Sequence, residues 1–213
     1  MRTIFGLVFL SLSGLPAAGA AAAWKAQWIW LPGVTGQNTW ACLRKQVTLD
    51  AKPATAVARI AAENKYWLYV NGTLVVQDGG LDARPDFNNT YFDQIDLAPY
   101  LRAGRNTLAA RVWYKGGLRS YSQITMGKGG FLFEAALTGA APAEILSDQS
   151  WKITQDVAFR PTTQQKQLSD YKWLSFPIEY DATQEIGPWQ DTSFVETGSW
   201  TAAGEAGIPP VAP

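Results

Sequence analysis

Two short stretches of the 213-residue sequence combine aromatic rings with amide, carboxylate and guanidinium groups, a combination suited to binding a sugar. An aromatic ring can pack against the apolar face of a sugar, while fixed polar side chains bond its hydroxyl groups. Each ring could equally pack in a core or at its rim, and both interpretations stay open. The first stretch contains Asp86, Asn88, Asn89 and Tyr91, and the second contains Trp113, Tyr114, Arg119 and Tyr121.

Composition excludes several kinds of catalytic site and partner. The sequence has no His, so neither a Ser-His-Asp triad nor a His-containing zinc site is possible. The single Cys42 cannot form a disulfide within the chain, and its apolar neighbours predict a buried, inert thiol. Lys plus Arg equals Asp plus Glu at 18 each, so no charge excess indicates a nucleic acid or a membrane surface as partner.

The acidic residues leave two possibilities open. Glycoside hydrolysis uses two carboxylates about 5–9.5 Å apart. No Asp or Glu of the sequence lies in a recognisable catalytic motif, so we predict that these residues are solvated surface charges. A complete hydrolase with an unrecognised carboxylate pair is the alternative. Asp181 and Glu185 could contribute to a calcium site, but two carboxylates fall short of the roughly 6–8 oxygen ligands that calcium takes. No other cofactor is expected.

The N-terminus has the three parts of a secretory signal peptide, which we place at residues 1–23. Arg2 is followed by an apolar run over residues 4–15 and then by an alanine-rich end. The run is shorter than the ~20 residues that a membrane-spanning helix needs. We therefore expect an exported protein, periplasmic or extracellular, that is cleaved before Ala21 or Trp24.

Residues 24–192 predict one domain, an all-β antiparallel sandwich. Short alternating apolar runs are separated by Gly, Pro, Asn and Asp, and no amphipathic helix is evident. Residues 193–213 are small, polar and finally Pro-rich, which is typical of a linker. We expect this linker to lead towards a missing C-terminal region, so that the chain is the front part of a longer protein.

A β-hairpin is the clearest local element. Two apolar runs, residues 66–70 and 73–76, flank Asn71 and Gly72, and this dipeptide favours the positive φ angles of a type I′ turn. Alternation of side chains predicts two further strands. They cover residues 107–113, preceded by a short helical turn, and residues 131–137.

Five segments follow one another along the chain after the signal peptide and together cover nearly all of it. They are AQWIW (26–30), YWLYVNG (66–72), DLAPYL and GRNTLA (96–109), SDQSWK (147–152), and EYDA with Glu185, Ile186 and Trp189 (179–189). In this order they resemble the N-terminal region of bacterial α-L-rhamnosidases, glycoside hydrolase family 78. Some of them also resemble the galactose-binding-like domains of the β-galactosidase and β-glucuronidase group. The late Tyr-Asp-Ala segment, well after an Asp-x-Ser-Trp turn, favours the rhamnosidases.

The resemblance implies a galactose-binding-like jelly roll, which in the parent enzymes is joined to an (α/α)6 barrel that holds the acidic catalytic residues. The sequence lacks the helical pattern of such a barrel. We therefore expect a non-catalytic accessory domain that contacts carbohydrate, in particular rhamnose-containing plant or microbial glycans, and its own catalytic domain. A free-standing exported lectin-like module is the alternative.

Overall fold

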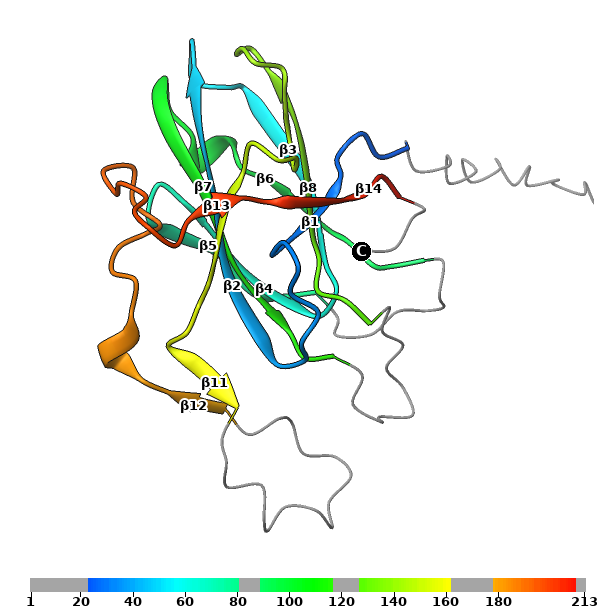
Figure 1. The fold of residues 1–213 in the computed structure, drawn as a ribbon. Helices are drawn as coiled ribbons and strands as arrows, with labels where there is room; N and C mark the ends of the chain where they lie inside the picture. The colour runs from blue at the N-terminus through cyan, green and yellow to red at the C-terminus, as the bar shows by residue number, and fades with distance from the viewer. Residues whose placement is uncertain (1–22, 81–88, 117–126, 162–177, 210–213) are drawn as a thin grey trace, which may run out of the picture.

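Antiparallel β-sheets form nearly all the regular structure of the chain. The computed structural model describes residues 23–80, 89–116, 127–161 and 178–209. Within them, two six-stranded sheets pack face to face as a sandwich (Figure 1). This confirms the predicted all-β antiparallel sandwich. In the same ranges, no helix is long and apolar enough to cross a membrane.

Sheet A contains, in spatial order, β14 (Gly204–Gly207), β1 (Trp28–Trp30), β8 (Phe131–Thr138), β3 (Thr55–Ala62) and β6 (Asp93–Asp96), with β9 (Glu144–Leu146) paired to β8. Sheet B contains β13 (Thr201–Ala202), β10 (Lys152–Gln155), β2 (Thr39–Leu49), β7 (Gly104–Tyr114), β4 (Lys65–Val70) and β5 (Thr73–Gly79). Sheet C is a small hairpin of β11 (Phe159–Pro161) and β12 (Ile178–Tyr180), and 3-10 helices cover Ala98–Tyr100 and Ala182–Gln184.

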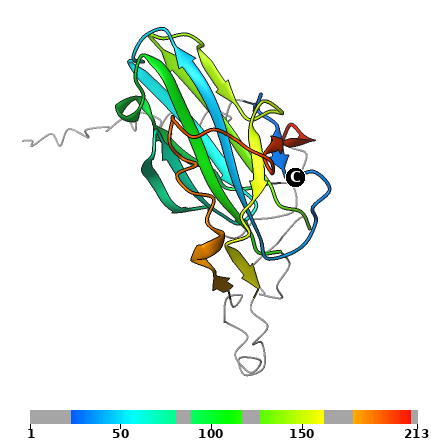
Figure 2. The same cartoon turned by 60° about the vertical axis from the view of Figure 1, so that its left-hand side comes forward.

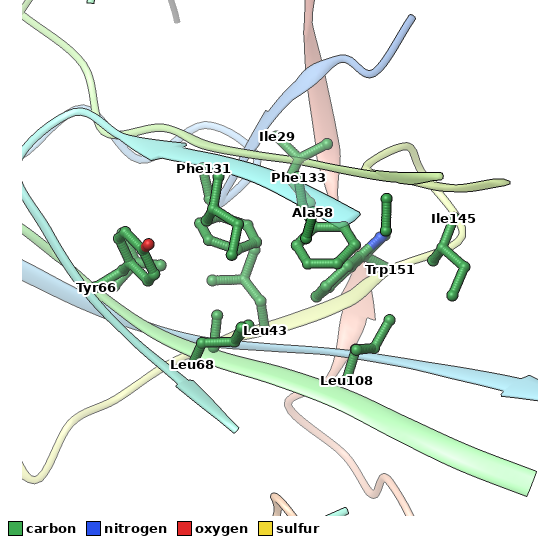
Figure 3. Packing of buried hydrophobic residues seen from close by; sticks show 14 of the residues in the cluster. Ile29, Leu43, Ala58, Tyr66, Leu68, Leu108, Phe131, Phe133, Ile145 and Trp151 are labelled. Carbon is green, nitrogen blue, oxygen red and sulfur yellow. The ribbon is translucent and has the colours of Figure 1, made fainter. Parts of the chain in front are cut away.

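The chain changes sheet at every connection between β2 and β8 except the β4–β5 hairpin. Strands that are consecutive in sequence therefore lie mostly in opposite sheets, as in a jelly roll. The two sheets enclose a core that is rich in aromatic rings (Figure 3). Trp151 packs edge-on against Phe131 with ring centroids 5.7 Å apart, and it also contacts Phe133 at 5.6 Å. Each such buried side chain contributes roughly 1.5–3 kcal/mol, so this cluster helps to hold the sheets together.

The predicted Asn-Gly hairpin is present as β4 and β5. Asn71 and Gly72 have φ angles of 52° and 82°, the left-handed values that a type I′ turn requires. Tyr66, Leu68 and Val70 share one face of β4 by alternation, and the structure buries this face in the core.

The strands predicted over residues 107–113 and 131–137 are parts of β7 and β8. The alternating residues of each strand face the core because successive side chains of a strand point to opposite faces. The residues that face the main core include Leu108, Ala110 and Val112 of β7, and Phe131, Phe133, Ala135 and Leu137 of β8.

Residues 193–209 are part of the folded domain, whereas the sequence predicted a linker there. β13 pairs with β10, and β14 pairs with β1, so this segment joins the edges of the two sheets (Figure 1). Ala203, between the two strands, is buried in the core. Strands this short show no hydrophobic periodicity, so their composition alone resembled that of a linker.

Residues 181–200, here called the strap, cross the outer face of sheet B (Figure 2). Trp189 of the strap is buried against Cys42 of β2 and Ala109 of β7. Tyr69 of β4 meets the Trp189 ring edge-on at 5.8 Å. The strap therefore forms a second small apolar cluster outside the main core.

Arg44 of β2 holds the strap in place. This side chain is fully buried, and it donates hydrogen bonds to the backbone oxygens of Asp191 at 3.0 Å and Phe194 at 3.4 Å. It also forms an ion pair with Glu196. Because Arg44 is central to sheet B, these bonds tie the strap to the rigid part of the sandwich.

Candidate carbohydrate-binding surfaces

The structure describes half of the predicted ligand-binding residues. Asn89, Tyr91, Trp113 and Tyr114 lie within the described ranges, whereas Asp86, Asn88, Arg119 and Tyr121 lie outside them.

Tyr91 and Asn89 are exposed next to an aromatic patch beside sheet A. Tyr91 is 49% exposed, and its neighbour Phe92 meets Trp24 edge-on at 5.6 Å. The guanidinium of Arg59 stacks on the Trp24 ring, 4.3 Å from its centre. The patch thus places exposed rings near a fixed cation, a combination that suits contact with a sugar.

Trp113 belongs to an aromatic row on the outer face of sheet B. It stacks on Trp40, its partner on β2, with ring centroids 4.9 Å apart and planes at 12°. Trp67 of β4 also stacks on Trp40, at 5.4 Å. The indole N–H of Trp113 donates a 2.9 Å hydrogen bond to the Oδ1 of Asn38. Trp113 is only 8% exposed, so little of its ring is open to a ligand.

Tyr114 faces the core, which corrects its prediction as a ligand contact. It is 1% exposed, and its ring meets Trp30 edge-on at 6.3 Å. Along β7 it alternates with Trp113, so the two rings point to opposite sides of sheet B. Alternation places Tyr114 on the same face of β7 as Leu108 and Val112, and this shared face was the available signal.

The two predicted groups occupy different parts of the sandwich. Tyr91 lies two residues before the edge strand β6 of sheet A, while Trp113 lies on the outer face of sheet B. The described residues of the two predicted stretches therefore belong to two separate aromatic surfaces.

The aromatic row continues onto sheet C. Phe159 stacks on Trp40 with ring centroids 4.3 Å apart, and Tyr180 packs on Phe159 at 4.9 Å. Trp40 is 5% exposed, whereas Tyr180 is 50% exposed. The row therefore passes from the surface of the sandwich to an open ring at Tyr180.

Sequence reasoning missed Trp40, Phe159 and Tyr180 as members of this row. One signal was available: Trp67 alternates with the apolar residues Tyr66 and Leu68, so β4 must carry an aromatic ring on its outer face. The joining of β2, β4 and sheet C into one row depends on long-range strand pairing, which alternation does not reveal.

Charged side chains lie on both faces of sheet C. The hydroxyl of Tyr180 donates to the carboxylate of Glu185, and this hydrogen bond raises the pKa of Tyr180. Asp181 accepts hydrogen bonds from the hydroxyl and the backbone N–H of Thr183, and these bonds hold its pKa below the usual range. Arg160 lies 3.8 Å from Asp181 and 3.3 Å from Glu179. Since Phe159 pairs with Tyr180 and Arg160 with Glu179, alternation places this charged group on the face of sheet C opposite to the Tyr180 ring.

A buried polar cluster beside the row links β2, β7 and the end of β10. The Nε of Arg111 donates to Asp156 at 2.9 Å, and the thiol of Cys42 contacts the same carboxylate at 3.4 Å. Burial raises the pKa of the Cys42 thiol, and the charge of Asp156 raises it further. The prediction of a buried Cys42 is confirmed, and a protonated thiol is a poor nucleophile.

Within the described ranges, no group of three or more His, Cys, Asp or Glu side chains could hold a metal ion. The two calcium candidates already have other partners, since Asp181 bonds Thr183 and Glu185 bonds Tyr180.

An open groove of about 560 Å³ runs beside β10. Its lining carries neither a charged side chain nor an aromatic ring, so it lacks a ring that could pack against the apolar face of a sugar. The lining residues are Leu31, Pro32, Ile153, Thr154, Gln155, Val157, Ile186, Ser199 and Thr201.

Known structures of similar fold are carbohydrate-active proteins. The chain superposes on a glycoside hydrolase family 78 rhamnosidase of Bacillus sp. GL1 with a TM-score of 0.69 and 25% identity, over 88% of this chain and 19% of the enzyme. An α-L-rhamnosidase of Aspergillus terreus gives a TM-score of 0.67 and 20% identity, over 87% of this chain and 21% of the enzyme. A Pleurotus ostreatus lectin gives a TM-score of 0.51 and 20% identity, over 88% of this chain and 44% of the lectin.

Neither a protein-family profile nor a curated protein sequence matches the chain. The structural matches cover most of the sandwich but only about a fifth of each rhamnosidase. The chain is therefore similar in fold to one segment of the family 78 α-L-rhamnosidases.

Proposed function

We propose that this chain is a non-catalytic, carbohydrate-binding accessory domain of an exported α-L-rhamnosidase-like glycoside hydrolase. The structural match to the Bacillus rhamnosidase carries the proposal, because it spans 88% of this chain and only 19% of the enzyme. A domain of that size within a much longer hydrolase leaves the chemistry to another part. The two exposed aromatic surfaces supply groups that suit sugar contact.

The carboxylates at the exposed end of the aromatic row fit binding better than catalysis. A glycosidase needs one carboxylic acid whose pKa is raised, so that it can protonate the leaving group. The hydrogen bonds from Thr183 instead lower the pKa of Asp181. Asp181 is thus a hydrogen-bond acceptor at neutral pH, which is the role of a carboxylate that contacts sugar hydroxyls.

Calorimetric titration of the purified chain with methyl α-L-rhamnopyranoside, rhamnose and neutral plant oligosaccharides, with and without calcium, tests the proposal. We expect a dissociation constant near millimolar, or about −4 kcal/mol, because a small open surface orders few groups around a sugar. The absence of heat with every sugar, confirmed by unchanged NMR spectra, would overturn the carbohydrate-binding proposal.

A free-standing lectin-like module is the second candidate. The fold match to the Pleurotus lectin supports it, since that match spans 88% of this chain and 44% of the lectin. The genomic reading frame that contains this sequence distinguishes the two candidates. A frame that continues into a long helical barrel region supports the accessory domain, and a frame restricted to this sandwich supports the lectin-like module.

Export is part of the proposal and rests on the N-terminal sequence. The predicted signal peptide, residues 1–23, lies outside the described ranges except for Ala23. Mass spectrometry of the chain exported by a bacterial host should find a mature N-terminus at Ala21 or Trp24. Intact Met1 on exported material would refute the signal peptide.

A further inference from the structure

We propose that Arg111, Trp67 and Tyr69, which are neighbours on the outer face of sheet B, form a subsite for one neutral pyranose ring. This inference rests on the proposed carbohydrate-binding function and assigns it to one place in the structure. The aromatic patch around Tyr91 is the competing location.

The strand register brings the three side chains together. Trp67 of β4 is the direct cross-strand partner of Arg111 on β7, and Tyr69 follows two residues later on β4. Alternation places all three on the outer face, because the adjacent Leu68 and Ala110 lie in the core. Opposite residues of antiparallel strands have Cβ atoms about 5 Å apart, and diagonal neighbours about 7–8 Å. One pyranose ring can therefore contact all three side chains.

The guanidinium of Arg111 is fixed in one orientation and still accessible. Its Nε donates to Asp156 at 2.9 Å, and the ring centres of Phe159 and Trp189 lie 4.8 Å and 5.9 Å from its central carbon. The side chain nevertheless remains 21% exposed. A guanidinium has five N–H donors, and the bond to Asp156 uses one of them, so donors remain for the oxygens of a sugar. A group that is fixed beforehand loses little conformational freedom on binding, and this favours affinity.

Trp67 supplies a supported ring beside the guanidinium. Its indole stacks on Trp40 with ring centroids 5.4 Å apart and planes at 24°. Trp40 is 5% exposed, whereas Trp67 is only partly buried. The accessible part of the Trp67 indole can pack against the C–H groups of a sugar ring, as aromatic rings in small-molecule sites do.

Tyr69 adds a hydroxyl group on the other side of Trp67. The Tyr69 ring meets Trp189 edge-on at 5.8 Å, which fixes its direction. Partial burial raises the pKa of Tyr69, and the nearby charge of Arg111 opposes this rise. Within the described ranges, the hydroxyl has no hydrogen-bond partner, and the residue is partly exposed. The protonated hydroxyl can therefore both donate a hydrogen bond to a sugar and accept one from it.

The ion pair of Arg111 with Asp156 favours a neutral sugar. Asp156 is 1% exposed, and its carboxylate balances the charge of the guanidinium. The subsite thus offers hydrogen-bond donors without a net positive charge, so it has no electrostatic preference for an acidic sugar. Neutral hexoses and deoxyhexoses are the expected ligand class.

NMR titration of the full chain with methyl α-L-rhamnopyranoside tests the subsite directly. The indole N–H signal of Trp67, identified by its absence from W67F, should shift as the sugar is added. This measurement uses the unmodified protein, so it does not depend on how well a variant folds. An unmoved Trp67 signal while the sugar binds would overturn the subsite.

Calorimetric titration of three variants completes the test. W67A should lose about tenfold in affinity for the rhamnoside, because the stacking surface is gone. Y69F removes only the hydroxyl and should lose about threefold. Tyr100, an exposed tyrosine at 38%, lies in the turn before β7, and Y100A is the matched control with unchanged affinity. Thermal unfolding of W67A and Y69F checks that both variants are folded.

The outcomes separate this inference from the proposed function. If the unmodified chain binds no sugar, the proposed function fails. If it binds the rhamnoside and Y91A weakens binding while W67A and Y69F do not, carbohydrate binding stands and the Arg111 subsite is overturned. Tighter binding of galacturonic acid than of the rhamnoside would overturn the neutral ligand class.

Discussion

At the scale of single residues, Arg44 and Tyr66 show how the sandwich accommodates polar groups away from water. A buried charge is tolerated when it is paired and hydrogen-bonded. Arg44 meets this condition by bonding two backbone oxygens and Glu196 of the strap. Tyr66 meets it by donating a 2.6 Å hydrogen bond from its core position to Asp93.

Replacing Arg44 by Ala should lower the free energy of unfolding by about 3 kcal/mol. The change removes three strap contacts and leaves a void under Phe194, whose ring centre lies 5.3 Å from the guanidinium. Urea unfolding measures the effect. Arg105, exposed on β7, is the matched control, and R105A should change stability by less than about 0.5 kcal/mol. Equal unfolding midpoints for the two variants would show that Arg44 does not hold the strap.

The buried hydroxyl group of Tyr66 should make the protein less stable at alkaline pH. Burial, aided by the bond to Asp93, raises the pKa of Tyr66 above the value of about 10 found in unfolded chains. The contribution of Tyr66 to the free energy of unfolding is therefore fully present below about pH 10. It falls above that pH, because only the unfolded state then releases the proton, at up to about 1.4 kcal/mol per pH unit. Urea unfolding between about pH 9 and 11 measures the effect. At pH 9 the variant Y66F should be less stable than the unmodified chain, and its free energy of unfolding should fall less steeply as the pH rises. If the free energy of unfolding falls equally steeply with pH in Y66F and in the unmodified chain, this account is wrong.

At the scale of elements, β13 and β14 decide where the domain ends. They pair with β10 and β1, which are far away in sequence, and the residue between them reaches the core. Two and four residues are too few to form a strand independently. Their structure depends on the edges of sheets that the rest of the chain has already built.

Adjacent alanines test this assignment. Ala203 is 3% exposed, whereas Ala202 on β13 is exposed. A203D places an unpaired carboxylate in the core and should lower the unfolding free energy by about 3 kcal/mol, while A202D should change it by less than about 1 kcal/mol. Thermal and urea unfolding of both variants measure the difference. If neither A203D nor A202D changes the free energy of unfolding, the segment is a linker after all.

At the scale of the whole molecule, the fold matches one segment of rhamnosidases that are about five times longer. We expect the purified chain not to hydrolyse an aryl α-L-rhamnoside, because the described acidic side chains at its exposed aromatic surface serve as hydrogen-bond acceptors. Chromophore release is compared with a buffer blank and with D181N. Release above the blank that a single Asp or Glu substitution abolishes would identify a complete hydrolase.

The sequence by itself determined the features that depend on near neighbours. Alternation of apolar residues identified β4, β7 and β8 and the residues that share a face of each strand, and Asn71-Gly72 specified the turn, because side-chain direction and turn angles are local properties. Composition excluded histidine chemistry outright. The order of the segments that resemble family 78 indicated a rhamnosidase-like sandwich, and the structural matches agree with that fold.

The tertiary structure alone decided how distant elements combine. Alternation separates Trp113 from Tyr114, yet only packing of the two sheets shows which ring is buried. The aromatic row from Trp67 to Tyr180 and the edge strands β13 and β14 arise from pairings across long sequence separations. Such pairings are selected by the burial of whole sheet faces, and no short window of sequence contains that information.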